Sequence, residues 1–358
     1  MKLLTRYLAR EIYSSIALVF FALLMLFAFF DLLRELDDLG RGNYHVGKVL
    51  LYVLLTVPAR LYELFPVAIL IGTIFALAQM AASSQLTIYR CSGVSLKQMI
   101  LALFKISLPL LVLSYLSGEF LAPTTERLAQ IIRLEALSAE IKLREFRSGI
   151  WVKDERNFVN VKNVLPDTTL LNISIYEFDK DYHLKSITSA KRASFVQAGL
   201  WQLNEATQTR FSPQGVVVNT LPSMEWRSAL NLDILRVLLV GPNQMSAWNL
   251  YLYTQHLRDN QQKTVRFEIA MWNKLLYPFA VLVMMLLALP FAVYRQREGG
   301  ISAKIFSGIV LGLTFHFASQ LFTNLGAINE WPAILSAITM PTLFLMLATY
   351  MLWSTERR

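Results

Sequence analysis

The residue types that most often perform chemistry are few and scattered in this chain. Its four histidines are far apart in the sequence, and Cys91 is the single cysteine. Metal sites usually draw Cys and His ligands from short, regular spacings. Each histidine is therefore interpreted as structural or exposed, and neither a metal site nor a catalytic residue is predicted. With one cysteine, the chain cannot form an internal disulfide. The histidines are His45, His183, His256 and His316.

One segment matches a phosphate-binding motif but is better explained as a turn. Residues Gly42 to Lys48 fit the pattern G-x-x-x-x-G-K, whose backbone amides cradle nucleotide phosphates. Val49 stands where the motif needs a Ser or Thr to hold magnesium, and no buried strand precedes the segment. We interpret it as a turn between two membrane helices, and we expect no nucleotide hydrolysis by this chain itself.

Six long apolar runs dominate the sequence and predict a polytopic α-helical membrane protein. Runs of roughly 18 or more apolar residues mark segments whose solvent is lipid. The third run is short, but it reaches spanning length if Lys105 extends to one interface and Glu119 lies at the other. The first run is too long for the apolar part of a signal peptide. The runs are Ile12–Phe30, Leu64–Tyr89, Ile106–Gly118, Leu275–Tyr294, Ile305–Asn329 and Trp331–Thr355.

The basic residues are concentrated on one side of the predicted membrane spans. They gather at the N-terminus, in the turns after the second and fourth spans, and in the C-terminal tail. By the positive-inside rule, both termini and these turns are cytoplasmic, and the polar central region lies on the opposite side. Membrane topology thus accounts for most of the net charge of +9, and no nucleic-acid partner is predicted.

The central region has the pattern of a separate β-domain. From Thr124 to Phe146, apolar residues recur at helical spacing, and after Gly149 the period changes to two. Short strands separated by turn residues indicate an antiparallel sandwich or jelly roll. We therefore predict three parts: helices 1–3 over 1–123, an all-β domain with flanking helices over 124–270, and helices 4–6 over 271–358. The predicted strands include 158–161, 173–176, 201–203 and 224–226.

The turn after the second span allows two interpretations. Residues Ala82 to Gly93 form a modestly polar segment that ends in glycine. One interpretation is a helical connector with a glycine C-cap. The other is a short interfacial helix that docks a cytoplasmic partner. The residues alone favour neither.

Four stretches together give the chain a resemblance to a known family. They are Thr5-Arg6-Tyr7-Leu8, Ser84-Gln85-Leu86 through Ser92-Gly93, Gly118-Glu119-Phe120-Leu121-Ala122-Pro123, and Met271-Trp272-Asn273-Lys274 running into Val283–Leu289. With them, the chain resembles the lipopolysaccharide-export permeases of the LptF/LptG family along its whole length, and LptG more than LptF.

The resemblance implies a location, a cargo and partners. It implies a multi-pass protein of the Gram-negative inner membrane, with a periplasmic β-jellyroll between spans three and four. It also implies a sister permease of the LptF kind, two cytoplasmic ATPase subunits, and jellyroll proteins that bridge the periplasm. The cargo would be lipopolysaccharide, destined for the outer membrane. No cofactor would bind this chain directly, because ATP and Mg would be held by the ATPase subunits.

The resemblance assigns ATPase coupling to the connector. The residues concerned are Ser84, Gln85, Leu86, Tyr89, Arg90 and Gly93. The family usually has Glu where this chain has Gln85. A charge-assisted hydrogen bond of about 1.5–3 kcal/mol would then become a neutral one of about 0.5–1.5 kcal/mol. Docking would depend more on Tyr89, Arg90 and their neighbours.

Lipid A bears phosphates and acyl chains, so its site needs fixed cations above an apolar wall. Arg34, Arg41 and Arg60 occur at the outer ends of spans one and two, and Arg133 follows span three at a basic position of the family. Arg34 could instead pair with Asp31 or Asp38 along its helix, and Arg41 could be an exposed loop residue. The family's lysines near the end of span one fall on acidic residues here, namely Asp31, Asp37 and Asp38.

The fifth span contains a G-x-x-x-G pattern from Gly308 to Gly312, which permits close helix approach in lipid. Ordinary packing explains it, whereas the resemblance implies a lateral gate through which the lipid enters. In the second case the gate or cavity wall would be Leu311, Leu313, Phe315 and Phe317. An envelope scaffold with a β-domain as its binding module remains an alternative to a permease. A lipid-modifying membrane enzyme is disfavoured because no acid, base or metal cluster is found.

Overall fold

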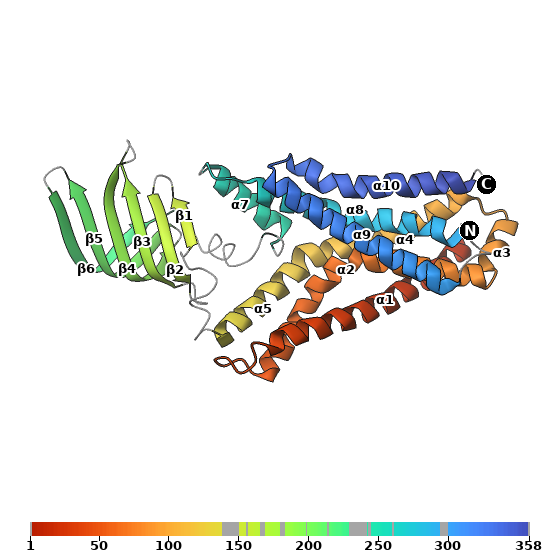
Figure 1. Cartoon of the computed structure of the whole chain (residues 1–358), viewed down its shortest axis with the longest axis horizontal. Helices are drawn as coiled ribbons and strands as arrows, with labels where there is room; N and C mark the ends of the chain where they lie inside the picture. Colours follow the sequence, from red (N-terminus) through yellow and green to blue (C-terminus); the bar gives the residue numbers. More distant parts are fainter. Residues whose placement is uncertain are drawn as a thin grey trace.

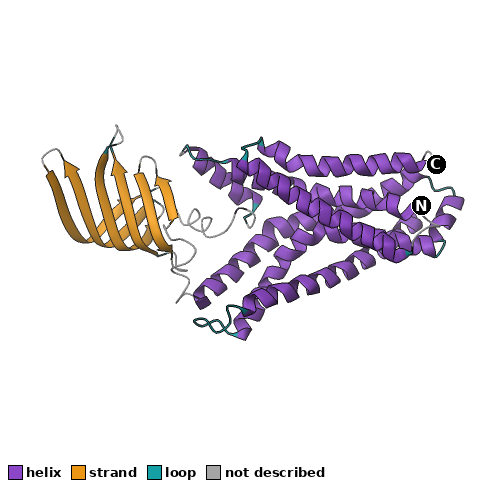
Figure 2. Cartoon of the chain, in the orientation of Figure 1, coloured by secondary structure: helices purple, strands orange, loops and turns teal. Residues whose placement is uncertain are grey.

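The structure is a computed structural model of the chain. It describes residues 2–137, 150–154, 157–164, 169–179, 183–197, 199–212, 215–228, 242, 245–259, 261–293 and 300–356. The molecule is elongated, with a bundle of long helices at one end and a β-sheet at the other (Figure 1). Figure 2 shows that helices and strands are fully segregated between these two parts.

Among the described residues, six helical segments are long and apolar enough to cross a membrane, which confirms the number predicted from the apolar runs. The first two and the last three are single helices. They are α1 (Lys2–Leu36), α2 (Val46–Ala82), α8 (Val265–Val293), α9 (Ile301–Ile328) and α10 (Ala333–Glu356). The basic turn at 294–299, between α8 and α9, lies outside the described residues.

The third span is longer than its apolar run because it continues into a helix that the sequence pattern assigned to the central region. Helix α4 (Leu96–Leu116) passes through a π-helical segment, η1 (Ser117–Leu121), into α5 (Ala122–Leu137) without a break. Lys105 therefore lies inside the span rather than at its start. The remainder of the predicted helix, 138–146, lies outside the described residues, and the proposed domain limit at 123/124 stays a prediction.

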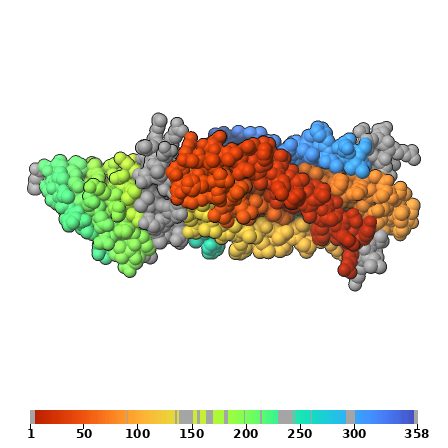
Figure 3. Space-filling model, turned by 90° about the horizontal axis from the view of Figure 1, so that it is seen from below, coloured from red at the N-terminus to blue at the C-terminus, as the bar shows by residue number. Residues whose placement is uncertain are grey.

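Helix α2 is the centre of the bundle, whereas α1 lies on its surface. Most of α2 from Leu64 to Met80 is buried, and it packs on α1, α8 and α9. By contrast, α1 runs along the outside of the bundle, as the space-filling view shows in red (Figure 3), and exposes large apolar side chains such as Phe21 and Met25. Exposed apolar side chains on a membrane-spanning helix are suited to lipid.

Glycines set the closest helix contacts in the bundle. A Cβ atom at Gly72 of α2 would lie 2.6 Å from the Cα atom of Ile16 in α1. On α9, a Cβ at Gly308 would meet the Ile74 side chain at 2.8 Å, and one at Gly312 would meet Val67 at 3.0 Å. The G-x-x-x-G pattern of the fifth span therefore packs against α2 of the same chain, as ordinary bundle packing requires.

At the end of the bundle remote from the sheet, the chain makes a tight connection between α2 and α4. Helix α3 (Gln85–Cys91) lies between Ser84 and Gly93, both of which have positive φ, at 59° and 80°. Ser95 then begins α4 with a capping box shared with Gln98. Both chain termini lie at this same end (Figure 1), as expected for an even number of spans.

The described strands of the central domain form a single sheet. The strands lie in sequence order and every neighbouring pair is antiparallel. All four quoted strand predictions fall on strands, but short connections pair each strand with its successor and do not distinguish a meander from a sandwich. The jelly roll is thus not confirmed. The strands are β1 (Ile150–Asp154), β2 (Asn157–Val164), β3 (Leu170–Phe178), β4 (Leu184–Gln197), β5 (Leu200–Ser212) and β6 (Gly215–Arg227).

One face of the sheet carries an apolar cluster that reaches the helix returning to the membrane. Trp201 of β5 and Trp226 of β6 are buried in it, with ring centroids 6.4 Å apart. Helix α7 (Ala247–Asp259) contributes Leu250 and Leu257, and the start of α8 contributes Ala270. The sheet, α7 and α8 therefore share one core, which joins the β-domain to the bundle.

The contact between α1 and α2 predicts a position-specific effect of adding one methyl group. We expect Gly72→Ala to lower the free energy of unfolding by about 1–3 kcal/mol, because the new Cβ overlaps the α1 backbone. Gly47→Ala is the matched control on the same helix, since nothing lies within 4 Å of a Cβ at that position. Thermal unfolding of the two variants in detergent measures the difference, and equal stability would contradict this packing.

Candidate functional site

The bundle encloses a cavity of about 450 Å³ on the side that faces the sheet. Its walls come from two groups of helices, with α1, α2 and α5 on one side and α8, α9 and α10 on the other. Figure 1 shows these two groups diverging towards the sheet. The lining residues of the first group include Asp31, Arg34, Glu35, Arg60, Glu63 and Glu126, and those of the second include Asn273, Lys274, Phe315, His316, Ser319 and Gln320.

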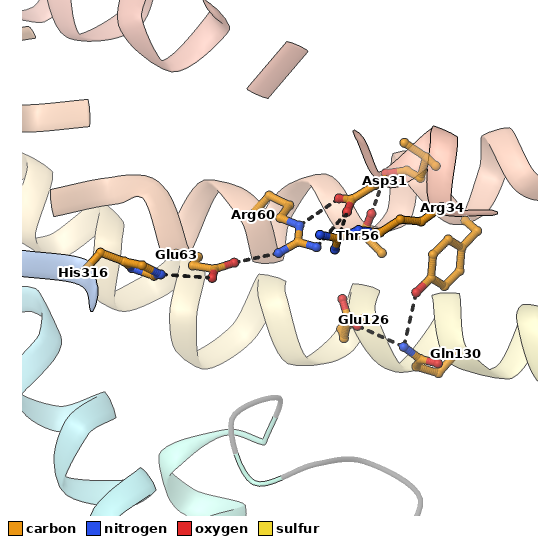
Figure 4. A network of polar contacts seen from close by, with 10 residues as sticks. Asp31, Arg34, Thr56, Arg60, Glu63, Glu126, Gln130 and His316 are labelled. Atoms are coloured by element: carbon orange, nitrogen blue, oxygen red, sulfur yellow. Dashed lines mark hydrogen bonds and ion pairs between the residues drawn. The ribbon is translucent and has the colours of Figure 1, made fainter. Parts of the chain in front are cut away.

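Arg60 is the most strongly engaged cation of the cavity. Its Nε and Nη2 atoms donate to the two carboxylate oxygens of Asp31, each at 2.8 Å, and its Nη1 atom donates to Glu63 at 2.9 Å (Figure 4). Asp31 is buried, so the bidentate pair ties α1 to α2 and supplies the partner that a buried carboxylate needs. On the other side of the cavity, His316 Nε2 lies 3.9 Å from Glu63 Oε1.

Arg34 also lines the cavity but is weakly engaged. Its side chain is 76% exposed, and its Nη1 atom lies 4.0 Å from Asp31 Oδ1, the carboxylate that Arg60 already holds. The predicted intrahelical pair between Arg34 and Asp31 is therefore present only at the limit of an ion pair. An exposed pair at this distance contributes little to stability, so the Arg34 guanidinium can bind an anion.

Arg133 lies beside the cavity rather than in its lining, in a closed polar cluster with α1. Its Nε atom donates to Glu35 at 3.0 Å and its Nη2 atom donates to Asp38 at 2.9 Å. The Tyr44 hydroxyl donates to the same Glu35 carboxylate at 2.8 Å, and burial together with this carboxylate raises the pKa of Tyr44. The cluster fixes the loop after α1 against α5.

Arg41 likewise lies outside the cavity lining. It donates to Asp38, three residues earlier, and remains half exposed. Of the four arginines selected from the sequence, the structure thus brings Arg34 and Arg60 into the cavity, and it places Arg41 and Arg133 beyond it. Only Arg34 lacks a strong carboxylate contact among these four described side chains.

The four apolar candidates of α9 do not share one face. Phe315 lines the cavity, is buried and packs edge-on against Phe344 of α10. Leu311, one turn earlier, packs against the bundle core. Leu313 and Phe317 are 44% and 67% exposed on the outside of the bundle. A helix of 3.6 residues per turn separates these pairs, so only the first pair faces inward.

Sequence reasoning missed several polar residues of the cavity. Asp31, Glu63, Glu126 and Lys274 all line it, but none of them was selected as a site residue from the sequence. Gln130 donates to Glu126 Oε1 at 3.2 Å and to the Tyr52 hydroxyl at 3.4 Å (Figure 4). Ionisable residues within membrane-spanning helices are functional candidates by default, and that rule would have identified them.

The connector helix α3 buries some of the residues that were expected to contact the ATPase and leaves others exposed. Leu86 and Tyr89 are buried in the bundle core. Gln85 is partly buried, and its Oε1 atom accepts from the Tyr7 hydroxyl at 3.3 Å. The exposed residues of this connector, on the cytoplasmic side of the predicted topology, include Ser84, Thr87, Ile88 and Gly93. The Tyr89 ring is thus packed against its own chain, and its docking role stays a prediction. The Arg90 side chain lies outside the described part of the structure.

The arrangement of the two walls is suited to binding an amphipathic molecule. Within the residues that the structure describes, no group of three His, Cys, Asp or Glu side chains is placed to hold a metal ion. Most ionisable side chains of the wall formed by α1, α2 and α5 are paired with one another. The opposite wall offers Lys274, neutral polar side chains and the aromatic rings of Tyr277 and Phe315. A molecule with an anionic headgroup and apolar chains matches these two walls.

Comparison with known proteins agrees with the motifs. The family model "Lipopolysaccharide export system permease LptF/LptG" matches residues 6–354. The chain is 31% identical over 350 residues to the lipopolysaccharide export system permease protein LptG of Haemophilus influenzae, covering 98% of each chain. It is 30% identical over 351 residues to LptG of Escherichia coli K12, covering 98% of this chain and 97% of that one. Because these matches extend over nearly its whole length, the chain belongs to the LptF/LptG family of lipopolysaccharide export system permeases.

Proposed function

We propose that this chain is the LptG-like permease subunit of an exporter that extracts lipopolysaccharide from the inner membrane and passes it along a periplasmic bridge towards the outer membrane. The family match and the LptG relatives support the substrate and the inner-membrane location. Six candidate membrane-spanning helices support a multi-pass transport subunit, which is not the catalytic component of its family. The β-domain would then lie in the periplasm and both termini in the cytoplasm.

The observation that carries this proposal is the two-walled cavity, in which Arg34 is the one of the four described candidate arginines without a strong carboxylate contact. Lipid A combines phosphates with acyl chains, and Arg34 offers a guanidinium to the phosphates where α1 meets the cavity. Phe315 and the neighbouring side chains of α8–α10 form the wall on which apolar groups can pack. Arg60 and Arg133 serve mainly to hold α1 in place, because carboxylates already occupy their donors.

The energy for lipopolysaccharide transport would come from ATP hydrolysis by partner subunits. We infer a sister permease of the LptF kind that completes the cavity, and two cytoplasmic ATPases that bind ATP and Mg. Helix α3 supports an ATPase contact because its exposed side carries Ser84, Thr87 and Ile88 at the end of the bundle remote from the sheet. Jellyroll proteins would receive the lipid from the β-domain.

The phosphate role of Arg34 can be tested by truncation to alanine. We expect Arg34→Ala to weaken lipopolysaccharide binding about tenfold or more, since a charge-assisted hydrogen bond contributes about 1.5–3 kcal/mol. Arg41→Ala is the matched control, because Arg41 lies one loop away and outside the cavity lining. Binding is measured by titrating lipopolysaccharide into the purified assembly in nanodiscs. Equal losses in both variants would exclude a specific role for Arg34.

Arg60 is expected to stabilise the fold by pairing with the buried Asp31 carboxylate. Arg60→Met leaves the buried Asp31 carboxylate without its bidentate partner, and we expect the free energy of unfolding to fall by about 1–3 kcal/mol. Adding Asp31→Asn removes the orphaned charge and should restore most of the loss. Thermal unfolding of the single and double variants in detergent compares them. A single variant as stable as the wild type would show that the pair does not hold α1 to α2.

A third test concerns coupling at α3. The chain purified alone should show no ATPase activity, whereas the assembled exporter should. In that assembly, Gln85→Glu should preserve or raise ATP hydrolysis coupled to transport, and Gln85→Lys should lower it, because an acidic side chain suits basic groups on the ATPase. Co-purification of the ATPase with each variant reports assembly separately. If Gln85→Lys left both assembly and transport unchanged, the position would have no docking role.

A further inference from the structure

The chain re-enters the bundle from the β-sheet at the start of α7, and the first turn of this helix is capped by another helix. The Glu119 carboxylate of η1 accepts from the Ala247 amide at 2.8 Å and from the Trp248 amide at 3.2 Å. Ser246 Oγ accepts from the Asn249 amide at 3.1 Å. A carboxylate at a helix N-terminus satisfies free amide donors and interacts favourably with the helix dipole.

The π-helical segment gives Glu119 its position. Segment η1 interrupts the α-helical spacing of the third span from Ser117 to Leu121. Its Gly118 lies directly against Tyr62 of α2, where an added Cβ would be 2.3 Å from the ring. Such π-helical insertions are rare and are found often at functional sites. Here the insertion and the glycine together bring the third span against α2 while Glu119 reaches α7.

A second side chain holds the residue just before α7. Lys274 of α8 donates from its ammonium group to the carbonyl of Met245. The same ammonium group lies 5.9 Å from the centroid of the Tyr62 ring, as in a cation–π contact. Glu119 therefore binds amides and Lys274 binds a carbonyl of adjacent residues, so two different helices fix the backbone of one junction.

The residues of this junction also belong to the cavity. Lys274, Tyr62 and Tyr277 all line it. The rings of Tyr62 and Tyr277 are 4.7 Å apart, and the Tyr277 hydroxyl donates to the Glu63 backbone carbonyl at 2.6 Å. Glu63 in turn accepts from Arg60. A continuous set of contacts thus leads from the start of α7 to the charged wall.

We propose that Glu119 and Lys274 are positioning residues that form a latch, which clamps the start of α7 and sets the orientation of the β-sheet domain relative to the cavity. Both residues occur in sequence stretches that carry the family resemblance, and the contacts that form the latch involve protein groups alone. The latch does not depend on which substrate is bound, so its test is separate from the tests of the proposed function.

Hydrogen exchange tests the clamp on the full-length chain in nanodiscs. In Glu119→Ala, the α7 amides at 247 and 248 should exchange about tenfold faster, as expected for the loss of a hydrogen bond to a charged group. Glu119→Gln keeps one acceptor oxygen and should give a smaller increase. Glu330→Ala is the control, because Glu330 pairs with the exposed Lys263, which lies between α7 and α8 rather than in α7. Unchanged exchange in Glu119→Ala would overturn the latch.

Exchanging the charges of Glu119 and Lys274 distinguishes the latch from a pair whose role is only to compensate each other's charge. Glu119 is close enough to Lys274 for the two to interact electrostatically. In the double variant Glu119→Lys and Lys274→Glu this attraction is kept, but Lys cannot accept from the α7 amides and Glu cannot donate to the Met245 carbonyl. The latch therefore predicts fast exchange in the double variant. If the α7 amides of the double variant exchanged as slowly as in the wild type, the proposal would be overturned and charge compensation alone would explain the pair.

Distances between spin labels test the effect on the domain. One label replaces Thr220 of β6 and the other Val46 at the start of α2, in a background where the exposed Cys91 is Ser. The label-to-label distance distribution should broaden in Glu119→Gln and further in Glu119→Gln with Lys274→Met, and it should stay narrow in Glu330→Ala. A distribution as narrow as that of the parent protein in the double variant would show that the latch does not orient the sheet.

Discussion

The bidentate ion pair between Asp31 and Arg60 is the interaction on which the cavity depends. A carboxylate buried near the end of a membrane-spanning helix is costly unless it is paired, and Asp31 has its partner on the neighbouring helix. Glu35, one turn further along α1, is buried in the same way and is held by Arg133 of α5. The two pairs place the outer half of α1 against α2 and α5, and this half of the bundle forms the charged wall.

This arrangement divides the cations into two roles. Removing either paired arginine leaves a buried carboxylate unsatisfied, so an anionic substrate that competes for Arg60 must also compensate Asp31 and Glu63. Arg34 carries no such cost, because its side chain is exposed and the one carboxylate that the described residues place near it is already bound by Arg60. In the proposed function, this accessible guanidinium would attract a phosphate and still release it. Release is as necessary to transport as binding.

Much of the fold follows from sequence pattern, while the site depends on contacts between distant residues. Uninterrupted apolar runs identify all six spans because a helix is the simplest way to satisfy backbone groups in lipid, and period-two runs identify the strands. The limits of the third span were missed because α5 is polar enough to resemble a surface helix, although it continues α4. The order of the strands was not predicted, because turn residues show where strands end and not which sheet they join.

The pairing of Arg60 with Asp31 also could not be predicted from the local sequence, because the two residues are 29 positions apart. Intrahelical spacing suggested Arg34 as the partner of Asp31, since neighbours three or four apart on a helix are the only pairs that a sequence makes visible. The same spacing, applied to α9, separates Leu311 and Phe315 from Leu313 and Phe317. If this chain exports lipopolysaccharide as we propose, acyl chains inside the cavity would meet Phe315, whereas chains still in the bilayer would meet Leu313 and Phe317. Passage from one pair to the other would then require the lipid to cross the edge of α9, where Gly308 and Gly312 keep that helix close to α2.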